Sequence, residues 1–461
     1  MAKSSGEGQG LNPLERRAAF SLAGIFSLRM MGLFLILPVF ALYAEDMAGV
    51  TPMLVGAAIG VYGLTQAVLQ IPFGMLSDRI GRKPVIIAGL LIFACGSAVA
   101  ASADTIWGII AGRALQGSGA IAAVIMALAA DLSREQRRLR MMAIIGMSIG
   151  AAFAVSLVLG PVLNSWIGVP GIFGLTSILA LLGVGVVLFV VPTPQKSEFH
   201  RDAEAVPGQF GKVLRDPELV RLDLGILILH MTLTALFLAF PLALRDLGMA
   251  SDSHWQVYLP VMLVAMAAMV PFVIIAESKR KMRPVFIGAV AALALAGLAM
   301  ALMRDLFAGL VLALLLFFIA FNLLEATLPS LVAKVAPGER KGTAMGVYSS
   351  SQFTGAFIGG LLGGWVHSQY GVEGVFLFCG GISTLWLLIA WGMSDPNYLS
   401  NFLLPVGELE EDDAALLEKE LSGVAGVAQA VVIPEDRIAY LKVDLALFDE
   451  SALDAYCAEQ A

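Results

Sequence analysis

Long apolar runs alternate with short polar segments along most of the chain, and each run is long enough to cross a lipid bilayer as a helix. A helix of about 20 apolar residues spans the hydrocarbon core, where it satisfies its own backbone hydrogen bonds. Breaks at charged residues, proline and glycine predict twelve such spans, at residues 19–44, 52–76, 83–101, 107–131, 141–163, 171–192, 222–244, 255–276, 284–303, 307–333, 343–366 and 372–393. We therefore predict an all-α polytopic membrane protein.

The second set of six spans repeats features of the first. The segment Leu33–Pro38, Leu-Phe-Leu-Ile-Leu-Pro, corresponds in the seventh span to Leu236–Pro241, Leu-Phe-Leu-Ala-Phe-Pro. Parallel repeats of this kind are a transporter architecture, in which the substrate path lies between the two halves near the middle of the membrane. We predict a six-helix bundle at 1–192, a linker at 193–221 and a second six-helix bundle at 222–395.

The composition changes after Asp395 to one that is typical of a small soluble domain. Alternating and helical patterns predict an α+β domain at 400–461 that resembles a ferredoxin-like unit without its last strand. The expected elements are strands at Phe402–Val406, Val427–Ile433 and Ile438–Val443 and helices at Asp412–Leu421 and Glu450–Gln460. This domain has no Cys-x-x-Cys pair, so we expect no metal site in it.

The overall composition excludes a soluble globular protein. Of the 461 residues, 58 % are hydrophobic and 14 % are charged, and the mean hydropathy is +0.84. These values lie far from those of soluble domains. The net charge of -7 arises partly from the acidic tail, and the N-terminus shows no cleavage site of a removable signal peptide.

Lysine and arginine are distributed unevenly between the two sets of loops. If both termini lie on one side, the N-terminal segment, the loops and the linker of that side carry 22 of the 29 basic residues. The opposite loops carry only Arg245 and Arg304. Because cytoplasmic loops are enriched in Lys and Arg, both termini are predicted to be cytoplasmic.

The loop between the second and third spans, Gly74–Lys83, combines glycines with charge. We expect Gly74 to permit close helix approach and Gly81 to form a turn. Charge is concentrated at Asp78, Arg79, Arg82 and Lys83. One interpretation is positive-inside topology alone, and the other is a gate at the membrane surface.

Two further motifs lie on the fourth and fifth spans. The fourth contains Arg113-Ala-Leu-Gln116-Gly117-Ser-Gly119-Ala120, and the fifth contains Gly160-Pro161. Together with the loop Gly-x-x-x-Asp-Arg-x-Gly-Arg-Lys, these motifs resemble those of the major facilitator superfamily. The match on the fifth span is partial, because Ser156 stands in place of the leading glycine.

This resemblance implies a transporter that works by alternating access, in the inner membrane of a bacterium. It places Asp78 at the start of the eleventh span, with Arg79, Arg82 and Asp131 completing a cytoplasmic latch that favours the outward-open state. It also implies that Arg113 assists proton transfer, for which anion binding is the alternative. The partial motif on the fifth span, together with Arg29, argues against cationic drugs as the substrate.

Ionisable side chains inside a bilayer are costly unless they line water or find a partner, so each is a functional candidate. Four lie away from span ends: Arg29, Arg113, His230 and Glu325, on spans one, four, seven and ten. In the related family these four helices line the central cavity. We hypothesise that protonation of Glu325, His230 or both is coupled to substrate movement, since such groups can titrate in the working range.

Other polar residues have two open interpretations. Tyr62, Gln66 and Gln70 recur at four-residue spacing on the second span, and Ser349–Gln352 forms a polar patch on the eleventh. Each set could face the substrate path. Small polar residues also hold membrane helices together, so the sequence leaves both interpretations open.

The sequence contains no nucleophile–base pair, nucleotide-binding loop or metal constellation. We therefore expect that the protein is not an enzyme, that it binds no metal or cofactor, and that a proton gradient drives it. The prediction is a monomeric, proton-coupled exporter of an unidentified small molecule, with the lipid bilayer as its environment and no nucleic-acid partner. The alternatives are a symporter, or a membrane sensor whose C-terminal domain binds a ligand or partner. Cavity shape sets substrate identity, which the sequence does not specify.

Overall fold

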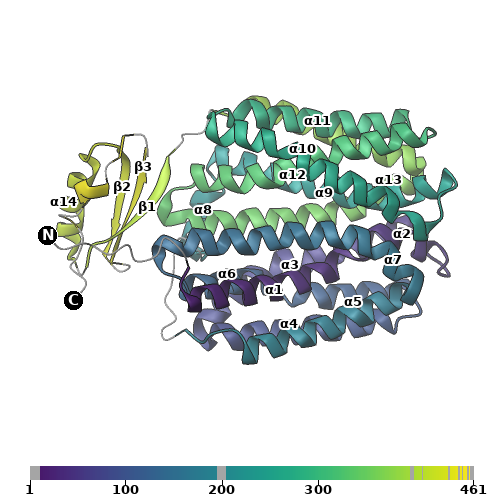
Figure 1. Ribbon diagram of the computed structural model, residues 1–461, viewed down its shortest axis with the longest axis horizontal. Coiled ribbons are helices and arrows are strands. Elements are labelled where there is room, and N and C mark those ends of the chain that lie inside the picture. Colours follow the sequence, from purple (N-terminus) through teal and green to yellow (C-terminus); the bar gives the residue numbers. More distant parts are fainter. Residues whose placement is uncertain are drawn as a thin grey trace.

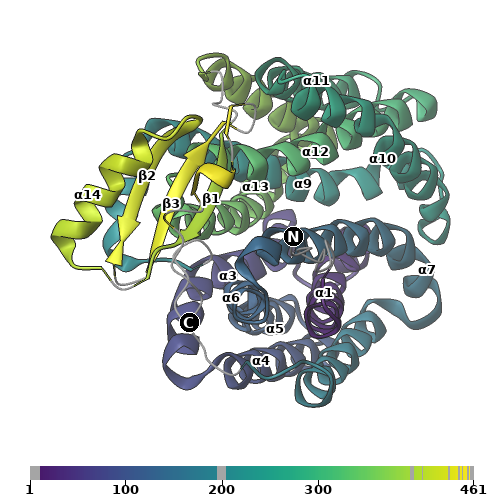
Figure 2. The same ribbon diagram turned by 60° about the vertical axis from the view of Figure 1, so that its left-hand side comes forward.

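Two helical halves lie side by side, and a small α+β domain sits at one end of them (Figures 1 and 2). The computed structural model describes residues 11–194, 204–394, 399–407, 409–434, 437–444, 447–448, 450–453 and 456. The first half consists of α1 (Pro13–Phe34), α2 (Leu37–Glu45), α3 (Pro52–Ile80), α4 (Arg82–Ala101), α5 (Ile106–Ser118), α6 (Ala122–Asp131) and α7 (Glu135–Phe189). The second half consists of α9 (Pro217–Asp246), α10 (Trp255–Ser278), α11 (Met282–Leu302), α12 (Phe307–Val335) and α13 (Lys341–Trp391).

Helix α7 contains two spans, because the chain reverses at Gly168, whose φ of 66° interrupts the helix. Just before α7, Arg134 donates to Glu15 at the start of α1 over 2.9 Å. Just after α7, the carbonyl of Val190 accepts a 2.7 Å bond from Arg17, also at the start of α1. Both ends of α7 therefore lie at the same end of the bundle.

Helix α13 reverses in the same way at Gly371, whose φ is 65°. Near its start, Thr343 donates to Gln209, which precedes α9, over 3.1 Å. Just after its end, Ser394 donates to Glu218 in the first turn of α9, over 3.1 Å. Ten helices in the described part of the chain are long and apolar enough to cross a membrane. Since α7 and α13 each cross twice, these ten helices make the twelve predicted passes.

Two of the predicted continuous spans are broken. The first divides into α1 and α2 at residues 35–36, because Pro38 in the first turn of α2 has no backbone N–H to donate to the preceding turn. The fourth divides into α5 and α6 near Gly119, where a side chain would overlap the carbonyl oxygen of Gly89 on α4. Close packing against α4 thus requires glycine at the second break.

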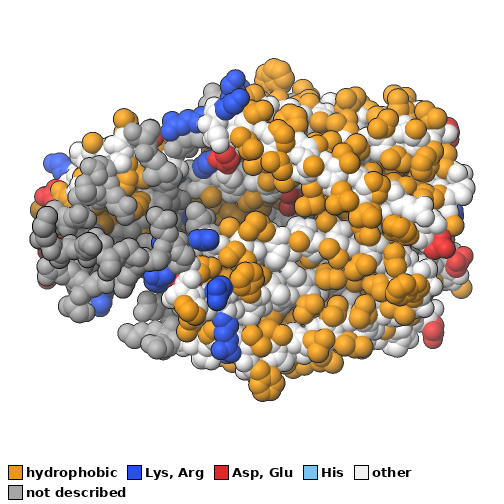
Figure 3. Space-filling view, in the orientation of Figure 1, with side chains coloured by type: hydrophobic (Ala, Val, Ile, Leu, Met, Phe, Trp, Pro, Cys, Tyr) orange, Lys and Arg blue, Asp and Glu red, His pale blue; other side chains and the backbone are white. Residues whose placement is uncertain are grey.

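The two ends of the helical body differ in charge. We call the end that carries Arg17, Arg82 and Arg134 the basic end, and the end that carries Arg245 and Arg304 the opposite end. In the space-filling view, Lys and Arg gather beside the C-terminal domain, Asp and Glu show at the far end, and apolar side chains cover the surface between them (Figure 3). This apolar belt matches the surface that lipid would cover.

The connection between the halves contains η1 (Pro207–Gln209) and α8 (Phe210–Val213). Two single turns lie within the second half: η2 (Ser251–Ser253) before α10 and η3 (Gly338–Arg340) before α13. Glu204 in this connection is buried. The polar linker is therefore packed against the bundle at this point.

The C-terminal domain has a three-stranded antiparallel sheet with strand order β1-β3-β2. Its elements are β1 (Ser400–Pro405), α14 (Glu411–Ser422), β2 (Val427–Ile433), β3 (Ile438–Val443) and η5 (Glu450–Leu453). Strand order and helix placement confirm the predicted ferredoxin-like unit. Most of the helix predicted at 450–460 lies outside the described residues.

This domain docks on the basic end of the second half. Lys442 of β3 donates from Nζ to the carbonyl oxygens of Lys334 (2.8 Å) and Val335 (3.2 Å), the last residues of α12. An ammonium group at a helix C-terminus is favoured by the helix dipole. Arg280, in the α10–α11 loop, pairs with Asp444 over 3.3 Å. Burial lowers the pKa of the Lys442 ammonium.

Candidate functional site

The loop between α3 and α4 gathers three carboxylates around Arg82. Gly81, with a φ of 95°, ends α3 and places Arg82 at the start of α4. Arg82 is buried and pairs with Asp78, with Asp131 over 3.1 Å and with Glu204 over 2.8 Å. The structure thus brings three gate-motif residues together and adds Glu204, which sequence analysis missed.

The expected contact between Asp78 and the start of the eleventh span is not formed within the described residues. Instead, the backbone N–H of Val206 donates to Thr343 near the start of α13 over 2.9 Å. Gln209 also donates to the carbonyl of Glu339, over 3.2 Å. The linker therefore occupies the position at which the resemblance placed Asp78.

The other residues of the gate motif, Arg79, Lys83 and Gly74, lie outside the cluster of carboxylates around Arg82. Arg79 is exposed. Lys83 donates to the carbonyl of Val191 over 2.7 Å and to Thr193 over 2.9 Å, which ties the loop to the end of α7. A Cβ at Gly74 would make only ordinary contact with Ala123, so the expected close approach there is wrong.

Arg29 of α1 and Arg113 of α5 lie on the same tyrosine ring in the first half. Their Cζ atoms are 5.7 Å and 5.0 Å from the centre of the Tyr62 ring, and Arg29 is also 5.9 Å from that of Phe93. Arg29 donates to Gln66, whereas Arg113 donates to backbone carbonyls of α3. Cation–π contact and hydrogen bonds hold both side chains in place.

The motif on the fourth span builds this cluster. Gln116 accepts from Arg113 over 3.0 Å and donates to Ser97 of α4 over 2.7 Å. A side chain at Gly117 would overlap the carbonyl oxygen of Tyr62. The motif's glutamine therefore orients Arg113, while Gly117 lets α5 approach α3. On α7, Gly160 and Pro161 pack beside the α1–α2 break, where a Cβ on Gly160 would lie 2.8 Å from Cγ of Pro38.

The resemblance places all four ionisable residues on helices that line a central cavity, but the side chains of the two arginines do not reach an open space in this structure. Arg29 is 1 % and Arg113 0 % exposed, because Tyr62 and Phe93 cover them. No described carboxylate lies within 4.0 Å of either guanidinium. In this state Arg113 has no adjacent acid with which to exchange a proton.

His230 of α9 and Glu325 of α12 form the other pair, in the second half. Nδ1 of His230 lies 3.5 Å from Oε1 of Glu325, and the Glu325 side chain is 32 % exposed. Nε2 of His230 lies 2.9 Å from the amide nitrogen of Gln352 on α13. An amide nitrogen only donates, so His230 accepts at Nε2 and, when neutral, carries its proton on Nδ1, the atom that faces Glu325.

Sequence analysis overlooked a second buried carboxylate. Asp223 lies in the second turn of α9, and one of its oxygens has no hydrogen-bond partner in the described part of the chain. The signal was available, because Asp223 lies within the predicted seventh span, but its place near the span end masked it.

An aromatic layer joins the two halves on one side of Glu325. The ring of Phe153 on α7 lies 5.8 Å from Phe321 and 6.1 Å from Phe318, both on α12. Phe34 of α1 packs edge-on against Phe153 at 4.9 Å. These residues lie nearer the opposite end than Glu325 does, because α12 runs from the opposite end to the basic end. The layer therefore separates Glu325 from the opposite end.

Further contacts close the opposite end. Arg245 of α9 pairs with Glu45 of α2 across the two halves. Glycines let α3 and α13 meet, since a Cβ on Gly56 would overlap the carbonyl oxygen of Gly360. Towards the basic end, Gln70 of α3 donates to Ser350 of α13 over 2.7 Å, so this polar residue holds helices together. The structure represents a state closed at the opposite end.

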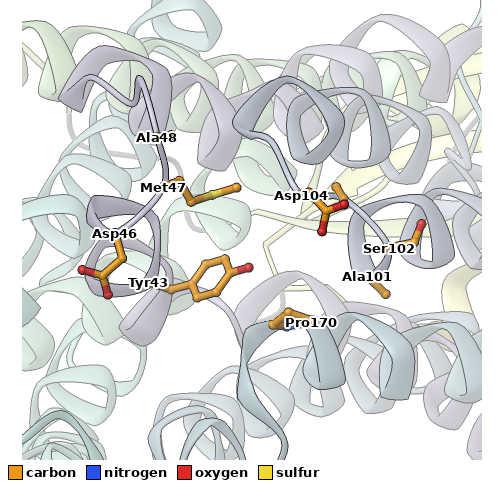
Figure 4. Close-up of a pocket in the computed structure, with 9 residues that line it drawn as sticks. Tyr43, Asp46, Met47, Ala48, Ala101, Ser102, Asp104 and Pro170 are labelled. Carbon is orange, nitrogen blue, oxygen red and sulfur yellow. The ribbon is translucent and has the colours of Figure 1, made fainter.

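A pocket of about 510 Å³ lies at the opposite end of the first half. Tyr43 and Met47 point into it, and Asp104 faces them across the space (Figure 4). Its lining contains none of the ionisable residues buried in the spans. We therefore do not place the transport site there.

Twelve passes in two repeated halves, with a charged loop after the second pass, define a membrane transporter of the major facilitator superfamily. The Major Facilitator Superfamily family model matches residues 22–359 and 310–408. The chain belongs to this family.

Individual relatives narrow the class. The chain is 46 % identical over 435 residues to the inner membrane transport protein YajR of Escherichia coli K12, covering 94 % of this chain and 95 % of that protein. It is 26 % identical over 250 residues to the multidrug resistance protein MdtM of Salmonella typhimurium, covering 54 % of this chain and 60 % of that one. A solved bacterial homologue of the human lysosomal transporter Spinster, described as inward-facing and occupied, aligns with a TM-score of 0.70 at 14 % identity, covering 84 % and 99 % of the two chains. That likeness concerns the fold alone.

Proposed function

We propose that this transporter exports a small molecule by alternating access, in exchange for protons, and that Glu325 and His230 carry the coupled proton. The observation that carries this proposal is the 3.5 Å pair of a carboxyl and an imidazole inside the membrane, with the Glu325 side chain partly exposed. Intramembrane ionisable residues mark ion and proton pathways. Resemblance to YajR supports transport, and resemblance to a multidrug resistance protein supports export as its direction.

Orientation follows from the basic end. Lys and Arg concentrate on the cytoplasmic side of inner-membrane proteins, so we place the basic end, both termini and the C-terminal domain in the cytoplasm. The state described here, closed at the opposite end, then faces the cytoplasm. In this state Glu325 releases its proton to the cytoplasm and the substrate enters between the halves.

Exchange requires that the transporter carries the substrate in one direction and the proton in the other, and not both together. In the outward-facing state, substrate leaves and Glu325 takes a proton from the periplasm. Nδ1 of His230 lies 3.5 Å from Oε1 of Glu325, which is close enough for a proton to pass between them after a small movement. Gln352 fixes the His230 tautomer through its 2.9 Å contact with Nε2. The proton-loaded transporter then returns to the state seen here.

Inside-out vesicles energised by a proton gradient test this proposal. A thermal-stabilisation screen first identifies compounds that bind the purified protein, and uptake of such a compound is then followed with and without the gradient. We expect Glu325→Gln to abolish the response to the gradient, whereas Glu373→Gln, an exposed carboxylate that pairs with Arg304, leaves it intact. Undiminished gradient-driven uptake in a Glu325→Gln, His230→Ala double variant would remove the proposal.

A second candidate function is a ligand-regulated sensor, which the docking of the C-terminal domain favours. Lys442 contacts the end of α12, the helix that carries Glu325. Deleting residues 400–461 separates the candidates. Transport that persists without the domain supports a transporter with an accessory domain, whereas a chain that never transports, with or without the domain, supports the sensor.

A further inference from the structure

Hydrogen-bond donors without acceptors are concentrated around Arg29. Four donors are buried and have no hydrogen-bond partner among the residues that the structure describes: Nε and Nη1 of Arg29, the amide nitrogen of Gln66 and the hydroxyl of Tyr62. Arg29 touches both other side chains, because it donates its remaining nitrogen to Gln66 and lies over the Tyr62 ring. Buried polar groups in native proteins are almost always paired. Four unsatisfied donors in one place therefore indicate a missing acceptor.

The charge at this place is also unbalanced. Arg29 and Arg113 lie against the same ring, both are fully buried, and no described Asp or Glu oxygen lies within 4.0 Å of either. A buried charge without a counter-charge is strongly disfavoured in a low-dielectric interior. The aromatic rings of Tyr62 and Phe93 offset part of this cost through cation–π contact, but they supply no acceptor for the free N–H groups.

A ligand that satisfies both features must carry negative charge and several acceptor oxygens. Carboxylate, sulfonate and phosphate groups match the planar fork of an arginine in this way. The surroundings are apolar, since Leu33, Phe93 and Phe353 pack around Tyr62. An apolar body attached to the charged group would fit them.

We infer that Arg29, Gln66 and Tyr62 form the recognition site for an organic oxyanion, which is the substrate class of this transporter, with Arg113 as the second positive charge. This inference rests on the proposed function, because a bound oxyanion is a substrate only if the protein transports it. The ring of Phe353 on α13 lies 6.4 Å from that of Tyr62. Phe353 directly follows Gln352, which contacts His230. When the halves move and Phe353 separates from Tyr62, the unpaired donors of Arg29, Gln66 and Tyr62 become open to the space between the halves.

The test measures binding without any gradient, on the purified full chain. The probes are benzoate, benzenesulfonate and phenyl phosphate, and their neutral counterparts are benzamide and benzenesulfonamide, all at one ionic strength. We expect at least one oxyanion to raise the unfolding temperature saturably, and the neutral compounds to leave it unchanged. Absence of stabilisation by all three oxyanions, or equal stabilisation by the neutral compounds, overturns the inference.

Variants assign the binding to this site. Arg29→Gln should weaken oxyanion binding at least tenfold, and Arg29→Lys, which keeps the charge but not the fork, should weaken it less. Tyr62→Phe should weaken binding and also raise the stability of the ligand-free protein, because it removes a buried hydroxyl without a partner. Arg304→Gln, at an exposed arginine of the opposite end, should change nothing. Wild-type affinity in Arg29→Gln overturns the inference.

The two proposals fail separately. Glu325→Gln should retain oxyanion binding while it loses the response to a proton gradient. If oxyanions bind and depend on Arg29 but no proton coupling is found, the coupling proposal alone fails. If coupling depends on Glu325 but only neutral or cationic compounds bind, the oxyanion inference alone fails.

Discussion

Nη2 of Arg82 lies 2.8 Å from Oε1 of Glu204, a residue 122 positions away in the linker between the two halves. Arg82 thereby joins Asp78 and Asp131 of the first half to the segment that contacts the start of α13 through Val206. The gate motif thus reaches the second half through the linker in this state. The Arg82–Glu204 pair therefore makes the charges of the α3–α4 loop sensitive to the position of the second half relative to the first.

Glu204→Gln should destabilise the state described here. Removing one carboxylate from a buried arginine loses a charge-assisted hydrogen bond, which contributes about 1.5–3 kcal/mol. Thermal unfolding of the purified protein should show a lower midpoint, whereas Asp305→Asn, at an exposed aspartate, should not shift it. A Glu204→Gln protein as stable as the parent would show that the linker contact contributes nothing.

Phe153→Ala should make the transporter leak protons. Phe153 bridges Phe34 of the first half and Phe321 of the second in the aromatic layer that separates Glu325 from the opposite end. Loss of this ring leaves space for water across the layer. Proton entry into liposomes that contain a pH-sensitive dye and no substrate should rise several-fold. Phe20→Ala, at a ring that is 64 % exposed, is the control and should not leak.

Gly56→Ala should oppose closure of the opposite end. A methyl group there would overlap the carbonyl oxygen of Gly360 on α13, so α3 and α13 would have to separate. In a cysteine-free background, Leu242→Cys, buried on α9 at this end, should become more reactive to an impermeant maleimide added on the side of the opposite end. Gly24→Ala has open space around its Cβ and should leave the labelling unchanged. Equal labelling in both variants contradicts the close contact.

Lys442→Ala should release the C-terminal domain from the end of α12. Its ammonium group provides the bonds to the last carbonyls of that helix. A short bis-maleimide cross-link between Arg280→Cys and Asp444→Cys, whose parent side chains pair over 3.3 Å, reports docking. Its yield should fall several-fold with Lys442→Ala but not with Lys419→Ala, on the exposed side of α14. An unchanged yield would mean that other contacts hold the domain.

Much of the architecture could be predicted because it depends on local pattern. Hydropathy located the twelve passes, since a bilayer selects apolar runs of one length. Strand alternation located β2 and β3 at the residues that the structure assigns to them. The breaks near Pro38 and Gly119 were missed, because a short interruption leaves the apolar run intact.

The candidate site could be predicted only in part. The sequence alone marked Arg29, Arg113, His230 and Glu325, because charge inside an apolar run is visible without a fold, and the signature loop marked Arg82. Which of these residues meet was decided by helix faces and by the approach of segments distant in sequence. Tertiary packing placed both arginines on Tyr62, paired His230 with Glu325 and brought Glu204 to Arg82. Burial and partner choice depend on three-dimensional contacts, and these settle whether a charged side chain lies in water, in a pair or beneath an aromatic ring.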